Sequence, residues 1–375
     1  MNSDARPILA LAGDPGGANA LAPVIALLRK DTSRSVLACA YRQAFDLWRE
    51  RGLDPQPQEV WQQRLPALVA GAALLLTATS VNGIDLERTA IALARHADVP
   101  SLTVLDYWSN YTQRFTDSDR EGALVLPDRI AVMDELARQD MLAVGFPDAT
   151  LVVTGQPAFD ALPGARVAFT PQRRADLRRE LGVGKDQLLA LYVSQPFADI
   201  HGSRDAAKAA LGYTEDEVLA LCRHALATLA RKRNFDCVLA IRPHPREPDE
   251  KFSETQETGL RTVIWRMADR LEAVLAADLV LGMNSVLLYE AACMGCAVVS
   301  VQPGLRGDDP LQSNRSGASL AVYDTEGLGN ALEKALFDEN KRKLRLVGLG
   351  KEAIAPMASE RVVQEIDKLL NTTHH

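Results

Sequence analysis

The sequence predicts two α/β domains in tandem, each built on a parallel β-sheet with helices on both faces. Three observations lead to this prediction. The chain has 375 residues, which is too long for one ordinary hydrophobic core and favours two domains. Short apolar, β-branched runs alternate with amphipathic stretches along nearly the whole length. These runs are apolar on both faces, as expected for strands of a parallel sheet that is buried on both sides.

The first half of the chain runs through this alternation once. Strands are expected over residues 8–13, 35–41, 73–79, 101–106, 129–134 and 150–155. Helices are expected over residues 18–30, 43–51, 84–97 and 135–144. Together they predict a Rossmann-like N-terminal domain over residues 1–165.

The alternation then restarts. Strands are expected over residues 188–194, 237–242, 278–283 and 297–301, with helices over 214–231, 268–276 and 285–294. Proline, glycine and a changing periodicity between residues 157 and about 174 indicate a linker. The second Rossmann-like domain is therefore expected over residues 166–355. Residues 356–375 are expected to form a C-terminal crossover helix, with its helical core at 359–370.

Composition excludes several functional classes. The formal net charge of −7 argues against a general electrostatic grip on nucleic acid or on an anionic membrane. No apolar stretch reaches the roughly 20 residues that span a bilayer. The N-terminus lacks the pattern of a secretory signal, so a cytoplasmic location is expected. Residues 374–375 are two histidines that resemble the remnant of a purification tag and carry no weight here.

The 5 cysteines are odd in number and lie in apolar segments, which favours reduced, buried thiols. Cys293 and Cys296 have the spacing of a metal or redox pair, but no second pair accompanies them, so packing is the preferred interpretation. Asp117 and Asp119 have the spacing of a carboxylate pair for a divalent ion. Because they lie in a polar stretch, a solvated turn is preferred there.

Ligands of open α/β sheets bind beyond the carboxyl ends of the strands, so the residues that end each expected strand are the candidates. The first strand ends in Gly13, Asp14, Gly16, Gly17 and Asn19. Glycines let a ligand approach the backbone, and the following helix offers free N–H groups. These residues are candidates for acceptor binding, with Asp14 as a candidate base. The alternative, an ordinary strand-to-helix turn, stays open.

The strand over residues 101–106 ends in a segment that mixes an acid, aromatic rings and an amide. Such a mixture suits a sugar, whose faces stack on rings and whose hydroxyls bind carboxylates. The alternative is a packed helix start with Asp106 as its cap. Asp106 is the second candidate base, and the candidate acceptor contacts are Tyr107, Trp108, Asn110 and Arg114.

In the second half, the strand over residues 237–242 ends in Arg242-Pro243-His244-Pro245-Arg246. A histidine fixed between two prolines and flanked by arginines forms a rigid cationic corner that suits phosphate oxygens. Arg242 and His244 are therefore candidates for phosphate binding, and His244 is also a candidate catalytic residue.

The strand over residues 278–283 is followed at once by Asn284 and Ser285 and then by a helix. Either residue can cap the helix while its N–H groups face a phosphate. Glu290 on the same helix is a candidate for a ribose diol. Ser194 and Gln195 end the strand over 188–194 and are candidate donor contacts. A plain helix cap and a solvated helix residue are the alternatives for Ser285 and Glu290.

These motifs resemble the GT-B glycosyltransferase superfamily and the related non-hydrolysing UDP-N-acetylglucosamine 2-epimerases. The resemblance covers essentially the whole chain and depends on the Pro-His-Pro corner, on the Asn284–Glu290 spacing and on the expected C-terminal helix. Residues 153–162 look like the segment that precedes the linker in those proteins. Residues 278–299 look like their nucleotide-binding strand–helix–strand, which implies that Glu290 takes the ribose hydroxyls.

Two shorter motifs are similar to those of bacterial capsule transferases that use CMP-activated keto-sugar acids. These are Gln195-Pro196 and His244-Pro245, and the second is also similar to a motif of bacterial sialyltransferases. The nucleotide therefore stays open between CMP and UDP. Two departures separate the chain from the epimerases. Their Arg-Pro-Glu type loop is replaced by residues 13–17 here, and their Ser-Gly-Gly by Asn284-Ser285-Val286.

The resemblance implies a metal-independent transferase in surface polysaccharide or glycoconjugate synthesis. It would move a sugar from a nucleotide-sugar donor to a glycan or small polar acceptor, in a cleft between the two domains. No cofactor beyond the nucleotide-sugar substrate is expected, because protein cations replace the metal. A nucleotide-sugar 2-epimerase, hydrolysing or not, and a non-catalytic nucleotide-binding protein are the alternatives. The sequence leaves the oligomeric state open.

Overall fold

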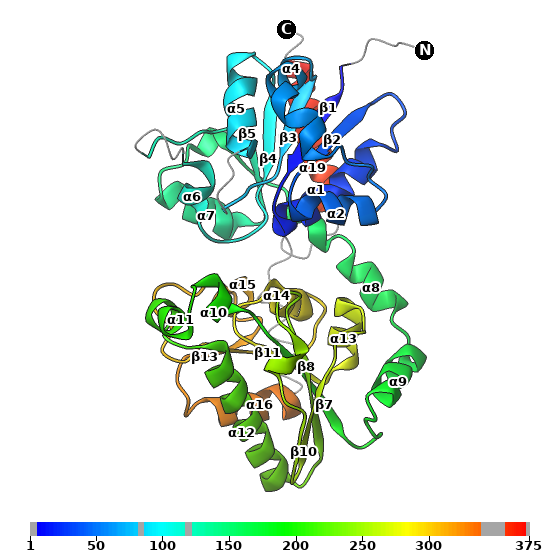
Figure 1. Ribbon diagram of the computed structural model, residues 1–375, viewed down its shortest axis with the longest axis vertical. Helices are drawn as coiled ribbons and strands as arrows, with labels where there is room; N and C mark the ends of the chain where they lie inside the picture. Colours follow the sequence, from blue (N-terminus) through cyan, green and yellow to red (C-terminus); the bar gives the residue numbers. More distant parts are fainter. Residues whose placement is uncertain (1–5, 82–85, 117–121, 339–356, 373–375) are drawn as a thin grey trace. The chain divides into compact units, whose positions relative to one another are not determined.

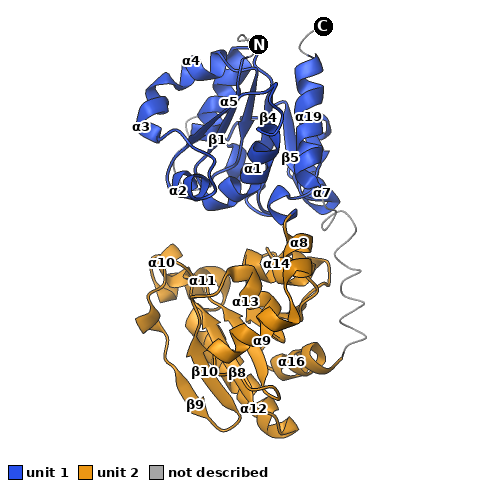
Figure 2. Cartoon of the chain, turned by 90° about the vertical axis from the view of Figure 1, so that its right-hand side faces the viewer, with its two compact units in different colours: residues 1–160, 352–375 blue, residues 161–351 orange. Residues whose placement is uncertain are grey.

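The computed structural model describes residues 6–81, 86–116, 122–338 and 357–372 (Figure 1). The chain divides into two compact units (Figure 2). Unit 1 comprises residues 1–160 and 352–375, and unit 2 comprises residues 161–351. The boundaries expected from the sequence, after residues 165 and 355, lie close to these limits. Among the described residues, no helix is long and apolar enough to cross a membrane.

Unit 1 contains a six-stranded sheet in the order β2-β1-β3-β4-β5-β6, and every neighbouring pair is parallel. β1, β3 and β4 are buried along their whole length, which explains why they are apolar on both faces. The strands are β1 (Ile8–Ala12), β2 (Val36–Ala40), β3 (Leu74–Thr77), β4 (Ser101–Val104), β5 (Arg129–Val132) and β6 (Leu151–Val153).

The helices of unit 1 follow its strands as the alternation predicts. They are α1 (Pro15–Leu28), α2 (Gln43–Glu50), α3 (Gln58–Trp61), α4 (Leu65–Ala70), α5 (Leu86–His96), α6 (Tyr111–Phe115) and α7 (Glu135–Ala143), with 3-10 turns at Gln62–Arg64, Asp148–Thr150 and Pro157–Phe159. The short helices α3, α4 and α6 are absent from the sequence prediction, because segments of this length show too little periodicity.

The chain returns to unit 1 for its last described helix, α19 (Ala358–Thr372). Val362 and Ile366 are fully buried in the same core cluster as α1 and β1. The Asp160 carboxylate accepts hydrogen bonds from the backbone N–H of Ala358 and from both donors of Ser359, which fixes the N-terminal end of α19. A helix at the C-terminal end of the sequence thus completes the core of unit 1.

Unit 2 contains a seven-stranded sheet in the order β13-β12-β11-β7-β8-β10-β9. All neighbouring pairs are parallel except β9 with β10, which places an antiparallel strand at one edge. The strands are β7 (Leu188–Val193), β8 (Cys237–Arg242), β9 (Thr255–Glu257), β10 (Leu260–Ile264), β11 (Leu279–Gly282), β12 (Val298–Val301) and β13 (Leu320–Val322).

The longest described helix of unit 2, α12 (Glu215–Arg233), begins with a capping box. Thr214 accepts from the Glu217 N–H, and the Glu217 carboxylate accepts from the Thr214 N–H, an arrangement worth about 1 kcal/mol. The helices are α8 (Leu162–Ala168), α9 (Pro171–Glu180), α10 (Phe197–Ile200), α11 (Arg204–Leu211), α12 (Glu215–Arg233), α13 (Arg270–Ala276), α14 (Val286–Cys293), α15 (Gln312–Arg315) and α16 (Leu328–Phe337), with a 3-10 turn at Asp249–Lys251.

The segment expected to be an interdomain linker, residues 157 to about 174, is largely helical. α8 lies within it and α9 begins in it. α9 packs on α13, and Arg178 of α9 donates to both the Ala276 carbonyl and the Asp278 carboxylate. Its prolines, which suggested a break, occupy the first turn of each helix, where the missing N–H costs nothing.

Each sheet has a point at which the strand order reverses direction. In unit 1 it lies between β1 and β3, and in unit 2 it lies between β7 and β11. Loops on either side of such a point diverge at the carboxyl ends of the strands, so this is where open α/β sheets hold ligands. The candidate residues can be placed relative to these two points.

Candidate functional site

Asp14 lies just beyond β1, after Gly13, at the reversal point of unit 1. The residue is only 7% exposed, and its carboxylate pairs with the Arg42 guanidinium at 3.4 Å. It also accepts a long bond of 3.4 Å from the Val81 N–H, beyond the end of β3. Asp14 occupies the N-cap position of α1, but its side chain does not cap the helix. The carboxylate therefore spans the gap between β1 and β3.

Asp106 reaches the same edge from the end of β4. Its Oδ1 accepts hydrogen bonds from the Thr79 hydroxyl, at 2.9 Å, and from the Arg114 guanidinium. Its Oδ2 lies against the first turn of α1, since a methyl group added at Gly16 would be 1.9 Å away from it. The positive end of the α1 dipole favours a negative charge there. Asp14 and Asp106 thus flank the end of β3 on opposite sides.

The three glycines of the first loop all have packing reasons. A methyl group at Gly13 would meet the Tyr41 ring at 2.1 Å, and one at Gly17 would meet the Ala78 methyl at 2.4 Å. Gly16 admits Asp106, as described above. These contacts are within unit 1, so the residues are explained without a sugar, and the acceptor contact expected for them stays a prediction.

The aromatic loop after β4 is more buried than the sequence suggests. Trp108 was expected to face a sugar, but it is 3% exposed, its ring stacks on Phe159, and its Nε1 donates to Asp134. That expectation is wrong for Trp108, because both its ring face and its polar edge have protein partners. Tyr107 is half-buried and lies edge-on to Trp108, whereas Asn110 is exposed.

Two further expected acceptor contacts have partners inside unit 1. Arg114 is 6% exposed and donates to the Ser109 carbonyl as well as to Thr79 and Asp106. It holds the Asp106 carboxylate in place. Asn19 accepts from Arg51 through its side-chain oxygen. The aspartates at 117 and 119 lie outside the described residues.

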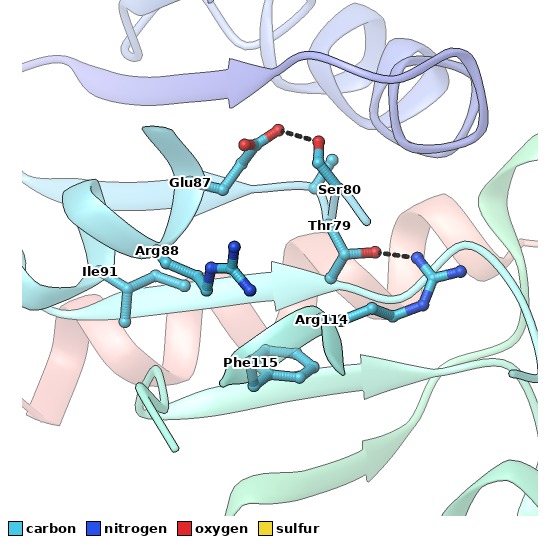
Figure 3. Close-up of a pocket in the computed structure, with 8 residues that line it drawn as sticks. Thr79, Ser80, Glu87, Arg88, Ile91, Arg114 and Phe115 are labelled. Atoms are coloured by element: carbon cyan, nitrogen blue, oxygen red, sulfur yellow. Dashed lines mark hydrogen bonds between the residues drawn. The ribbon is translucent and has the colours of Figure 1, made fainter. Parts of the chain in front are cut away.

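Glu87, in the first turn of α5, was missed by the sequence reasoning. It is 3% exposed, and its carboxyl accepts from the Tyr41 hydroxyl at 2.5 Å and from the Ser80 hydroxyl at 2.8 Å. Burial raises the pKa of Glu87 to about 7, although the two hydroxyl bonds lower it and the Asp14 charge raises it further. Figure 3 shows Glu87 bonded to Ser80 beside the Thr79–Arg114 pair, around a small cavity.

In unit 2, the reversal point is bridged by two amides. Gln195, after β7, donates through Nε2 to the Asn284 side-chain oxygen at 2.8 Å and accepts from the Asn284 N–H at 3.0 Å. Ser285 caps α14 by accepting from the Leu287 N–H. The first turn of α14 therefore begins at the reversal point, with its N–H groups at the carboxyl edge of the sheet.

The neighbouring loop after β8 is held by a buried acid that the sequence reasoning also missed. Glu247 is 4% exposed and accepts from the His244 N–H, the Ser194 hydroxyl and the Lys251 ammonium, each within 3.0 Å. Lys251 also bridges to Glu215. Ser194, expected to contact a donor, is thus buried and bonded to Glu247. Glu247 joins the ends of β7 and β8.

His244 itself is half-buried, and its Nδ1 accepts from the Arg246 N–H at 3.2 Å. Burial lowers the pKa of His244, and the Glu247 charge opposes that shift. A neutral ring with Nδ1 as acceptor carries its proton on Nε2, which makes it a hydrogen-bond donor. His244 was expected to contribute to a cationic corner, whereas near neutral pH it offers a neutral donor.

Arg242 and Glu290 complete the residues expected in unit 2. Arg242 is half-buried and donates to the Ala268 carbonyl at 2.9 Å. Glu290 was expected to take a ribose diol, with a solvated helix residue as the alternative; it is 2% exposed and ion-paired with Arg270 of α13. A ribose contact through Glu290 stays a prediction, in which the sugar shares the carboxylate with Arg270.

The cysteines have no disulfide partner. Cys39, Cys222 and Cys237 are buried, and burial raises the pKa of each to about 12. Cys296 lies 3.8 Å from the Val274 carbonyl, on α13. Packing accounts for the positions of these thiols, and they take no part in the candidate sites.

Comparison with solved structures supports the fold assignment. No family model matches the chain, and no curated protein matches it. Solved structures do match along nearly the whole length. UDP-GlcNAc 2-epimerase from Neisseria meningitidis, bound to UDP-GlcNAc, has a TM-score of 0.66 at 14% identity and covers 96% of this chain and 100% of its own. S. aureus MnaA with UDP has a TM-score of 0.66 at 14% identity, with 98% and 97% covered.

A third structure is similar. UDP-GlcNAc 2-epimerase from Methanocaldococcus jannaschii, in complex with UDP-GlcNAc and UDP, has a TM-score of 0.62 at 14% identity and covers 96% of this chain and 99% of its own. The epimerases have the GT-B fold, and the fold expected from the sequence, two Rossmann-like domains of the GT-B type, is confirmed. At this identity the likeness concerns the fold, and the chemistry must come from the residues.

Proposed function

We propose that this chain binds a UDP-activated amino sugar and inverts its C2 centre, as a nucleotide-sugar 2-epimerase. The observation that carries the proposal is the pair of carboxylates, Asp14 and Asp106, on either side of the end of β3. The fold supports it, because similar structures were solved with UDP-GlcNAc or UDP bound.

Inversion at C2 requires that a proton leave one face of the sugar ring and that a proton return to the other. Carboxylates on two sides of one substrate can act as base and acid for these steps. Loss of the nucleotide from C1 assists removal of the C2 proton: the C–H electron pair forms a C1=C2 double bond while the C1–O pair leaves with UDP. In the reverse step, UDP adds to C1 and a proton adds to C2 from the other face, which restores the single bond between C1 and C2. Asp106 is the first candidate base, because Arg114 and Thr79 fix its orientation.

Unit 2 supplies groups that suit the departing diphosphate. The first turn of α14, the His244 ring and Arg242, the last residue of β8, all lie at or just beyond the carboxyl ends of strands of one sheet. Fixed donors of this kind stabilise charge that grows on a leaving phosphate, and each commonly contributes a factor of about 100 to 1,000 in turnover. Gln195 and Asn284 are held by each other close to the same edge.

Glycosyl transfer, in a route to surface polysaccharide or glycoconjugate, is the second candidate. The motifs Gln195-Pro196 and His244-Pro245 favour it, since they resemble those of capsule transferases, and so does Asn284-Ser285-Val286 in place of the Ser-Gly-Gly of epimerases. An acceptor hydroxyl would then replace the ring proton as the group deprotonated by Asp14 or Asp106. Tyr107, Asn110 and Asn19 would contact the acceptor.

Incubation with UDP-GlcNAc and no acceptor separates the two candidates. For an epimerase, chromatography should resolve a second UDP-sugar that differs at C2, and Asp106→Asn should abolish its formation. An unchanged donor that is consumed only after a glycan is added would support the transferase. Thermal shift with CMP, CDP, UDP, GDP and TDP identifies the nucleotide, because a ligand that binds only the folded state raises the melting temperature.

A further inference from the structure

Glu87 lies in unit 1 among hydroxyl groups. Its carboxyl is bonded to Tyr41 and Ser80, and among the described residues no cation forms an ion pair with it. A buried carboxylate without a cationic partner is costly, so such a group keeps its proton more readily than an exposed one. Burial is the main cause of the rise in the pKa of Glu87 to about 7.

The cavity beside Glu87 is small, and both polar and apolar side chains line it. Its volume is about 10 Å³, which is room for one water molecule. Glu87 and Ser80 line one side of it, and Thr79 and Arg114 line another (Figure 3). The Thr79 hydroxyl in turn donates to Asp106 at 2.9 Å. A water in this cavity would lie among residues that include Glu87 and Thr79, and the Thr79 hydroxyl leads on to Asp106.

Among the described residues, the other charged and titratable groups that the contacts place near this path fall into two sets. Those facing Glu87 and Ser80 are Tyr41, Asp14 and the Arg42 that pairs with Asp14. Those lining the cavity or bonded to its walls are Arg88, Arg114 and Asp106. Arg88 donates through Nη1 to the Gln113 and Thr116 carbonyls.

We propose that Glu87 stores a proton for Asp106 and exchanges it through one water in this cavity and the Thr79 hydroxyl. In one direction, Glu87 gives its proton to the water, the water gives a proton to the Thr79 oxygen, and the Thr79 hydroxyl proton passes to Asp106. A carboxylic acid and a carboxylate exchange identities, and no other species is consumed. This role rests on the proposed function, in which Asp106 gains or loses a proton at each turnover.

Carbon NMR of protein labelled at the Asp and Glu carboxyl carbons tests the store without any substrate. One glutamate carbon should titrate near pH 7 and be missing from Glu87→Gln. The matched control is Glu59→Gln, an exposed glutamate of the same unit, which should leave that signal in place. Ser80→Ala removes a bond that lowers the pKa, so it should move the midpoint upward. Absence of any glutamate titrating above pH 6, or survival of the signal in Glu87→Gln, would overturn the proposal.

The path to Asp106 is tested with Thr79→Val, which removes the hydroxyl while conserving volume. The glutamate step near pH 7 should persist in Thr79→Val, because this variant leaves Glu87 and its bonds to Tyr41 and Ser80 in place, while turnover should fall. Full turnover in Thr79→Val would contradict the path.

Turnover separates this proposal from the proposed function. If C2 inversion occurs, Glu87→Gln and Thr79→Val should each lower kcat by roughly 100-fold with little change in KM, and the double variant should be no slower than either. Turnover in Glu87→Gln with an unchanged pH profile would support the epimerase and contradict the proton store. If the wild type shows no turnover but Glu87 titrates as expected, the epimerase would be contradicted and the protonated Glu87 would not.

Discussion

Glu87 gives the stability of this protein a pH dependence with a definite sign. Its pKa rises on folding from 4.5 to about 7, so between these values the folded chain holds a proton that the unfolded chain has lost. The contribution of Glu87 to the free energy of unfolding is largest below about pH 4.5. It falls as the pH rises from 4.5 through 7, by up to roughly 3 kcal/mol. Urea unfolding of unit 1, compared between wild type and Glu87→Gln, should show this decline in the wild type alone. Parallel curves from pH 4.5 to 7 would contradict it.

His244 is expected to act through its neutral Nε2–H. His244→Ala should lower turnover by roughly 100-fold, as loss of one fixed donor to a leaving group commonly does. His224→Ala, at an exposed histidine of α12, is the matched control and should behave as wild type. A steady-state assay with the nucleotide sugar measures both, and equal losses in the two variants would remove His244 from the site.

The sequence identifies some of these residues and misses others for a physical reason. Asp14, Asp106 and His244 follow strands, and open α/β sheets bind their ligands at the carboxyl ends of strands. Glu87 and Glu247 are functional candidates because they are buried, which depends on packing. A signal for Glu87 was nevertheless present: it lies at helical spacing with Ala90, Ile91 and Ala94, so an acid sits on the apolar face of α5.

At the scale of elements, α1 and the Asp106 loop fit together only because residue 16 has no side chain. Gly16→Ala should displace the Asp106 carboxylate and destabilise unit 1 by about 1–3 kcal/mol, as overpacking does. Gly164→Ala in α8 is the control, since nothing lies within 4 Å of the added methyl group. It should be neutral or stabilising. Denaturant midpoints and the nucleotide-sugar assay measure both variants. Equal midpoints and equal activities for the two variants would contradict the contact between Gly16 and Asp106.

Most long elements could be predicted, whereas the short ones could not. The expected strand at residues 237–242 matches β8 to the residue, because the apolar run at residues 237–241 is followed by Arg242 and a proline corner. The sequence pattern does not predict β10 or the edge strand β9. β9 is exposed along its whole length and β10 is only partly buried, so neither has the continuous apolar run of a buried strand. The prolines in the segment of α8 and α9 predict a linker, whereas proline in a first turn is compatible with a helix, and both segments are helical.

At the scale of the molecule, the core of unit 1 depends on the far end of the chain. Ile366→Ala removes a side chain that is fully buried in the cluster with α1, so it should cost about 2–5 kcal/mol. Gln364→Ala, at an exposed position of the same helix, should cost little. Hydrogen exchange by mass spectrometry should report faster exchange in β1 and no change in β7. Equal loosening of both sheets would contradict the division into units.

The fold follows from a repeated pattern of buried strands and helices, which many sequences share, whereas the reaction depends on a few side chains. A single fold hosts many chemistries, so the GT-B architecture does not choose between epimerisation and transfer. Epimerisation is favoured by Asp14 and Asp106 in unit 1, and unit 2 separately contains donors that suit a diphosphate.

Proton NMR of UDP-GlcNAc with the protein in D₂O tests that choice most directly. Abstraction at C2 should replace the C2 proton with deuterium, produce the signals of the 2-epimer, and fail in Asp106→Asn. A sugar that keeps its C2 proton through prolonged incubation, while UDP still raises the melting temperature, would contradict the epimerase.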